Sequence, residues 1–126
     1  MVMAEKVAVG VSQVRIDVHG GIAFVTVRGD VDRGMAPGLR DVLAWAVDHH
    51  DGVVADLSGA GHVDRAGLSV LLQSQDRAHV RACALALAEP SPALRSALAG
   101  LQADAMFPMF DHCADAVAWL RTAGHR

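Results

Sequence analysis

The chain of 126 residues has no tyrosine, three phenylalanines and two tryptophans, so aromatic side chains can fill little of its interior. Hydrophobic residues still make up 52% of the sequence, and much of that share is alanine and valine. A chain of this length is long enough for one domain around one core. We therefore expect a single domain with an aliphatic core at residues 13–123, preceded by a poorly ordered segment at residues 1–12.

Lysine is almost absent, since Lys6 is the only one beside ten arginines. Acidic residues outnumber basic ones by 14 to 11, and no run of basic residues could follow a phosphate backbone. Nucleic acid is therefore not an expected partner. The preference for arginine over lysine is typical of proteins from GC-rich bacterial genomes.

Long apolar runs and paired cysteines are also missing. No run reaches the roughly 18 residues that a membrane-spanning helix needs, and the first residues lack the charged and then apolar layout of a secretory signal. Cys83 and Cys113 lie in separate apolar stretches without CxxC spacing, which favours buried thiols in a reducing compartment. We expect a cytoplasmic protein that does not insert into a membrane.

Strand and helix patterns alternate along the chain. The order β-β-α-β-α-β-α-β-α predicts a mixed sheet in an α/β fold. Asp64, Ser91 and Asp111 stand where each could cap the helix that follows it, and Pro37 and Pro92 suit first turns. The predicted strands are 15–18, 22–27, 52–57, 83–88 and 107–110, and the predicted helices are 36–49, 64–79, 92–100 and one after Asp111, with a loop at 58–63.

The apolar positions of these elements predict one buried core. Its members share the inward faces of the first two helices and of the central strands. They are Leu39, Val42, Leu43, Val54, Leu57, Leu68, Leu71, Leu72, Leu85 and Leu87.

Three stretches together resemble the STAS domain family, of the anti-sigma factor antagonist type. They are VRGDVD at 27–32, VADLS at 54–58 and VDRAGLSVLL at 63–72, and later turns at 90–95 and 107–111 also fit. The resemblance covers about residues 15–120. It implies a four- or five-stranded mixed sheet with helices mainly on one face.

The resemblance also implies a protein-binding regulator of transcription. Its relatives bind an anti-sigma factor that is also a serine kinase of the histidine-kinase-like ATPase type, and phosphorylation of the serine after the loop aspartate ends the binding. Here Arg65 and Ala66 follow Asp64 where the family has serine or threonine. We therefore expect an antagonist that is not phosphorylated at this position.

The resemblance places the partner-binding surface on the loop and the helix after it. The expected contacts are Ser58, His62, Asp64, Arg65, Ala66, Gly67, Ser69 and Gln73. Asp64 is interpreted as a helix cap and not as a catalytic acid. The Ser58 hydroxyl is expected to satisfy a backbone group, and Ser58 is the best alternative phosphorylation site.

Signatures of catalysis and metal binding are missing. The sequence has no G-x-S-x-G elbow, no H-E-x-x-H, and no P-loop lysine after Gly59 and Gly61, which suggest loop flexibility. Among seven histidines, neighbouring His49 and His50 diverge by about 100° on a helix. The sequence therefore predicts no enzyme, no cofactor and no metal site.

Two other functions remain open. Without the serine, a STAS fold could serve as a scaffold or sensory subunit of a larger regulatory assembly. It could also act as a small-molecule sensor, although the lack of tyrosine and of a basic phosphate cradle disfavours this.

Overall fold

The computed structural model describes residues 14–122, which form five strands and four α-helices in the predicted order. The predicted disordered segment at residues 1–12 lies outside the described residues. The elements are β1 (Val14–His19), β2 (Ile22–Val31), α1 (Ala36–His49), β3 (Gly52–Val63), α2 (Arg65–Val80), β4 (Ala84–Ala88), α3 (Pro92–Gly100), a 3-10 turn η1 (Asp104–Met106), β5 (Met109–Phe110) and α4 (Cys113–Thr122).

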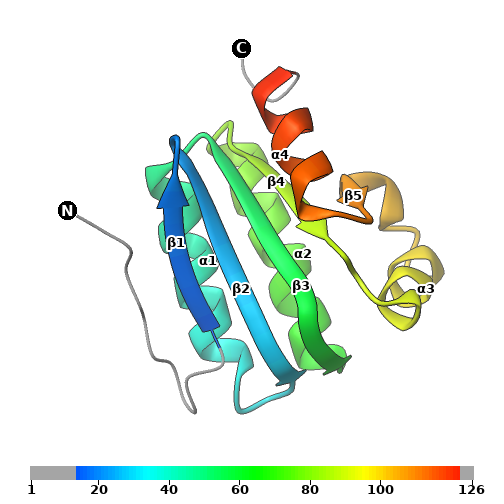
Figure 1. Cartoon of the computed structure of the whole chain (residues 1–126). Helices are drawn as coiled ribbons and strands as arrows, with labels where there is room; N and C mark the ends of the chain where they lie inside the picture. Colours follow the sequence, from blue (N-terminus) through cyan, green and yellow to red (C-terminus); the bar gives the residue numbers. More distant parts are fainter. Residues whose placement is uncertain (1–13, 123–126) are drawn as a thin grey trace.

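The strands form one mixed sheet in the order β1-β2-β3-β4-β5 (Figure 1). β1 and β2 pair antiparallel, and the other neighbours pair parallel. Gly20 and Gly21 make the hairpin turn with φ values of +59° and +82°, which only glycine adopts at little cost. The predicted mixed sheet of four or five strands is confirmed, and it has five.

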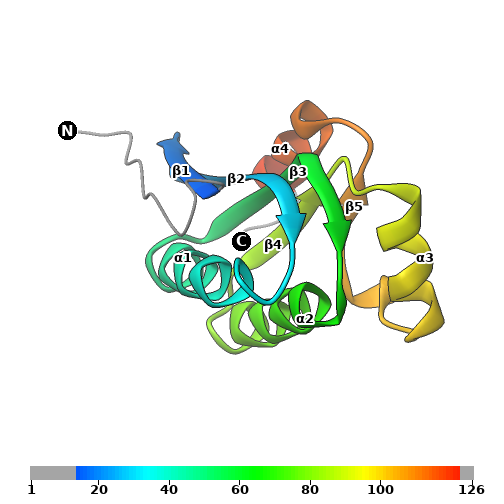
Figure 2. The same ribbon diagram turned by 90° about the horizontal axis from the view of Figure 1, so that it is seen from below.

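Helices cover both faces of the sheet, but unequally (Figure 2). α1 and α2 pack on one face and α4 on the opposite face, while α3 lies beyond β5 at the edge. Alternate residues of β3 consequently enter two separate clusters: Val53, Ala55 and Leu57 face α1 and α2, whereas Val54 faces α4. The prediction of one core that includes Val54 was wrong, because a strand with helices on both faces buries both sets of side chains.

β3 is longer than predicted. Residues 58–63, expected to be a loop, continue the strand and pair with the end of β2, from Arg28↔Gly59 to Val31↔Val63. Two register shifts interrupt this pairing. The glycines of this stretch resemble a loop in the sequence, and only their pairing with β2 makes them a strand.

The inward face of α2 is also rotated from the predicted one. Its buried residues are Gly67, Val70, Leu71, Ser74, Gln75 and Ala78. Leu68 and Leu72, predicted to be buried, are half-buried at the margin of the core. Three adjacent apolar residues, 70–72, fit more than one inward face, so the periodicity left the orientation of the helix ambiguous. The side that packs on the sheet is the one that carries the small residues Gly67, Ser74 and Ala78.

Two predictions for the last third of the chain differ in detail. The strand predicted at 107–110 pairs only through Met109 and Phe110. Asp111, predicted to cap α4, instead accepts a hydrogen bond from Arg95 Nη2 at 2.9 Å. The caps predicted for the other two helices are confirmed, since Ser91 Oγ accepts from Leu94 N at 3.1 Å and Asp64 caps α2.

Both cysteines are free thiols. Cys83 is buried, and this burial, with nearby Asp51 and Asp48, raises the pKa of its thiol to about 12. Cys113 is half-buried, and burial with Asp56 and Glu89 raises its pKa as well. Since the thiolate is the reactive form, neither cysteine is prepared to act as a nucleophile.

No helix within residues 14–122 is both long and apolar enough to span a membrane.

One carboxylate joins the two helices of the larger layer. Asp48 of α1 accepts hydrogen bonds from Arg77 Nε and Nη2 at 2.8 and 2.6 Å, and from Arg81 Nε at 3.1 Å. The hydrogen bond from Arg77 is the largest cause that lowers the pKa of Asp48 from 3.8 to about 2. The bidentate geometry fixes the end of α1 against α2.

This ion pair predicts a pH dependence of stability. The pKa of Asp48 is lower in the folded protein, so its contribution is complete above the unfolded value near 3.8 and is lost as pH falls toward 2. We expect the stability difference between wild type and Asp48→Asn, measured by urea unfolding, to shrink from pH 5 to pH 3. Asp76→Asn, an exposed carboxylate on α2, serves as the control. If the stability difference between wild type and Asp48→Asn is the same at pH 5 and pH 3, the lowered pKa of Asp48 in the folded protein is contradicted.

Candidate partner-binding site

Most of the predicted contact residues lie where the end of β3 meets the beginning of α2, whereas Ser58 lies near the middle of β3 and Gln73 near the middle of α2. Parallel strands end at the same edge of a sheet, and the loops and helix starts at this edge commonly form binding sites. We call this region the α2-start surface and define it by the residues predicted from the sequence. They are Ser58, His62, Asp64, Arg65, Ala66, Gly67, Ser69 and Gln73.

Asp64 sets the beginning of α2. Its Oδ1 accepts a hydrogen bond from Gly67 N at 3.0 Å, and its carbonyl accepts from Leu68 N at 2.8 Å. The backbone N–H of Asp64 donates to Val31 O at 3.1 Å, which ties the helix start to the end of β2. The carboxylate is therefore occupied as the predicted N-cap, and it holds Arg65 at the first position of the helix.

Gly67 is buried and does not offer a side chain to a partner. A Cβ at this position would lie 2.6 Å from Val31 Cγ1 and 2.8 Å from Val31 O. The absence of a side chain lets the first turn of α2 rest directly on the end of β2. Its role is to position the residues around it, of which Ala66 is half-buried.

The sequence analysis missed Asp30 as a site residue. Its Oδ1 accepts a hydrogen bond from His62 N at 2.8 Å, across the second register shift between β2 and β3. A Cβ on Gly61 would collide with Asp30 Oδ1, and one on Gly59 would lie 3.2 Å from both Arg28 Cγ and Val27 O. These glycines thus permit close strand pairing, and the interpretation as loop flexibility was wrong. The only signal in the sequence for this contact of Asp30 was that an acidic residue directly follows Gly29.

The outward side of α2 carries a continuous row of accessible side chains. Arg65, Ser69 and Gln73 are exposed and follow each other at intervals of four residues, so they lie on one face of the helix. The half-buried Leu68 and Leu72 lie beside this row. The arrangement combines a cation, two hydrogen-bonding groups and apolar area, which suits contact with another protein.

Ser58 lies in β3, at the first register shift, and is exposed. Its backbone N–H donates to Asp56 Oδ1 at 3.0 Å, so the neighbouring aspartate satisfies the backbone here. No hydrogen bond of the Ser58 hydroxyl occurs within residues 14–122, contrary to the prediction. The hydroxyl is accessible from the solvent.

Arg65 carries an uncompensated charge at this surface. No carboxylate of the described part of the chain lies within 4 Å of its guanidinium. Arg65 also stands at the helix end where the backbone dipole is positive, an arrangement that costs about 0.3 to 1 kcal/mol at an exposed site. A cation at this position is therefore not explained by the stability of the helix.

The histidines between residues 14 and 122 do not gather at one place. Within the described residues no three side chains of histidine, cysteine, aspartate or glutamate cluster so as to hold an ion. The rings of His49 and His50 both contact Trp45, and their Nδ1 atoms lie 2.8 Å from Trp45 O and 2.9 Å from Ala46 O. Both rings therefore bind carbonyl groups at the end of α1.

Comparisons with known proteins agree with this architecture. Residues 13–116 match the family model of the STAS domain. The solved structure of an anti-sigma factor antagonist from Mycobacterium paratuberculosis is 25% identical, covers 86% of this chain and 92% of its own, and has a TM-score of 0.77. A search of curated protein sequences finds no match.

Two more distant solved structures share the fold. The Bacillus cell fate determinant SpoIIAA in its phosphorylated form is 15% identical, with 86% of this chain and 99% of that chain covered and a TM-score of 0.71. A sulfate transporter family protein from Wolinella succinogenes is 23% identical, with coverages of 82% and 88% and a TM-score of 0.72. The fold thus occurs in proteins of different function.

The tight packing around Gly67 predicts that a glycine-to-alanine substitution, which usually stabilises a helix, destabilises this protein. Glycine to alanine in a helix usually stabilises by about 0.5 to 1 kcal/mol. We expect Gly67→Ala to destabilise by about 1 to 3 kcal/mol, because the new methyl group must displace Val31 and Val63. Gly100→Ala at the end of α3 is the matched control, since a Cβ there meets nothing within 4 Å. Chemical denaturation of both variants measures the difference, and equal effects would show that α2 does not rest on β2.

Proposed function

Because the chain belongs to the STAS domain family, we propose that it is an anti-sigma factor antagonist-like regulator of transcription in the bacterial cytoplasm. It binds its partner through the α2-start surface and is not phosphorylated at the usual position. The partner is an anti-sigma factor or a serine kinase of the histidine-kinase-like ATPase type. The observation that carries the proposal is Arg65, which is exposed at the first position of α2 and has no hydroxyl.

The surface supports a role in binding and not in catalysis. Its carboxylates serve the backbone, since Asp64 caps α2 and Asp30 accepts from His62 N. Neither cysteine belongs to this surface, and burial raises the pKa of both thiols, which disfavours the reactive thiolate. What remains accessible is the row of Arg65, Ser69 and Gln73, with Leu68 and Leu72 beside it, and this row offers contacts without a reactive group.

The charge of Arg65 favours a permanently binding form. In a phosphorylated relative, a phosphate at the start of the helix adds negative charge next to free backbone N–H groups. A guanidinium has the opposite sign and cannot imitate that state. The protein therefore stays in the form that corresponds to the unphosphorylated, partner-binding state of its relatives.

A second candidate function is supported by the transporter-family structure. STAS folds occur there within a protein of another class, so this chain could supply contacts within a larger regulatory assembly. An adjacent sigma factor and kinase in the genome would favour the antagonist, whereas an operon for a sensory assembly would favour the scaffold.

Reversal of the charge at position 65 tests the binding surface. We expect Arg65→Glu to change the affinity for the cognate anti-sigma factor by about tenfold, because the variant reverses the charge that this surface presents to the partner. The melting temperature should not fall, since Arg65 is exposed and has no ion pair within residues 14–122, and a carboxylate at the positive end of α2 removes the helix-dipole cost of the arginine. Arg40→Glu on α1, also exposed, is the matched control. Isothermal titration calorimetry that gives equal affinity for wild type and Arg65→Glu would remove this region from the interface.

Incubation with ATP and an anti-sigma kinase from the same organism tests whether the protein is phosphorylated at the start of α2. We expect a stable complex and no phosphate on residues 64–67, measured by intact mass and peptide mapping. Phosphate on Ser58 would contradict the proposal and move the switch to β3, where the Ser58 hydroxyl is exposed. Ser58→Ala distinguishes the two results, because it removes that hydroxyl and leaves Arg65 unchanged.

A further inference from the structure

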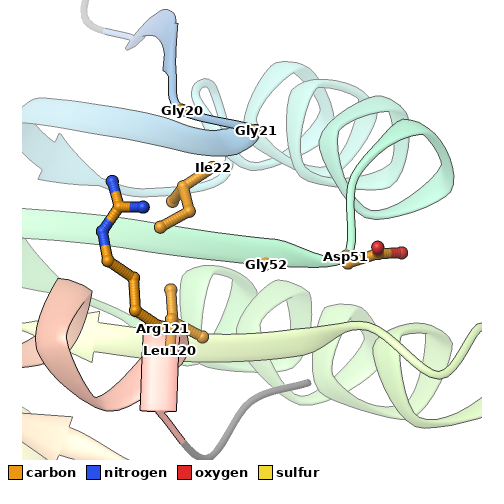
Figure 3. A pocket seen from close by; sticks show the side chains of 7 residues that line it. All are labelled: Gly20, Gly21, Ile22, Asp51, Gly52, Leu120 and Arg121. Carbon is orange, nitrogen blue, oxygen red and sulfur yellow. The ribbon is translucent and has the colours of Figure 1, made fainter. Parts of the chain in front are cut away.

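A hollow of about 300 Å³ lies at the end of the sheet opposite to the α2-start surface (Figure 3). It is bounded by the β1–β2 hairpin turn, the beginnings of β2 and β3, and the end of α4. Segments far apart in the sequence therefore meet here. The lining residues are Gly20, Gly21, Ile22, Asp51, Gly52, Leu120 and Arg121.

Part of the hollow is apolar and firmly packed. Ile22 and Leu120 are 6% and 2% exposed and belong to the cluster between the sheet and α4. Gly52 completes this part, because a Cβ there would lie 3.4 Å from Leu120 Cδ1 and would take up space in the hollow. The three lining glycines leave room that larger residues would fill.

Arg121 supplies a cation beside this apolar part. Its guanidinium lies against Gly20, where a Cβ would come within 2.9 Å of Nη2. No carboxylate of residues 14–122 lies within 4 Å of Arg121. Figure 3 shows the carboxylate of Asp51 pointing away from the guanidinium, at the far side of the hollow. Among the described residues the charge of Arg121 thus has no carboxylate partner, and the apolar part of the hollow lies beside it.

We propose that this hollow binds a small aliphatic monocarboxylate. The planar guanidinium can donate two parallel hydrogen bonds to a carboxylate, and a short aliphatic chain can fill the space that Gly20, Gly21 and Gly52 leave beside it. The volume is at the lower end of the range for small-molecule sites. A single guanidinium matches one negative charge, whereas a phosphate brings more charge and no apolar group to fill the space that the glycines leave.

Titration of the full chain with sodium butyrate, followed by amide NMR spectra, tests the site. For so small a ligand we expect a Kd on the order of 1–10 mM. The saturable shifts should concentrate at Gly20, Gly21 and Gly52. Butylammonium chloride at equal ionic strength should give no saturable shift there. Inorganic phosphate that binds as well as butyrate would show that the aliphatic chain contributes nothing, and the ligand class would be wrong.

Variants of Arg121 separate the guanidinium from general charge. We expect Arg121→Gln to raise the Kd for butyrate at least about tenfold, since hydrogen bonds to charged groups are among the stronger ones. Arg121→Lys should fall between this variant and wild type, because it keeps the charge without the paired donors. Arg40→Gln is the control and should bind as wild type does. An unchanged Kd for Arg121→Gln, in a protein with unchanged melting temperature, would overturn the proposal.

Discussion

The parallel pairing of β2 with β3 continues past the point where most of the sheet ends, and the rest of the structure depends on this extension. Asp30 holds it across a register shift through His62 N, and Val31 O accepts from Asp64 N where the strand gives way to α2. Because each shift inserts an unmatched residue, the strands bend and twist locally. The direction in which α2 leaves the sheet is therefore determined before its own side chains pack.

The close packing of α2 on the end of β2 then determines which side chains of α2 are exposed. Gly67 lets the first turn of α2 rest on Val31, and Ser74 and Ala78 continue the same small-residue side along the helix. With that side against the sheet, Arg65 must face the solvent. Arg65, which the resemblance in sequence aligns with the family phosphoacceptor, is thus accessible for structural reasons.

The two ends of the sheet have different chemistry. At the carboxyl ends, carboxylates are used in backbone hydrogen bonds, and the accessible groups form a row suited to a protein. At the amino ends, glycines leave a small hollow beside Arg121, whose guanidinium has no carboxylate partner within residues 14–122. Both ends are formed by β2 and β3, so the pair of strands connects the proposed partner surface with the proposed ligand site through one rigid sheet.

The sequence by itself determined the order of the elements, the caps at Asp64 and Ser91, and the absence of a hydroxyl at position 65, because these are local properties of neighbouring residues. It also led to the prediction of a partner-binding site at the beginning of α2. Only the tertiary structure decided that residues 58–63 are strand, that Leu68 and Leu72 lie at the margin of the core, and that Asp30 contacts His62. These features arise from contacts between β2, β3 and α2, which are separated along the chain. Local patterns of glycine and of adjacent apolar residues fit more than one such packing, and the close approach of the backbones selects one.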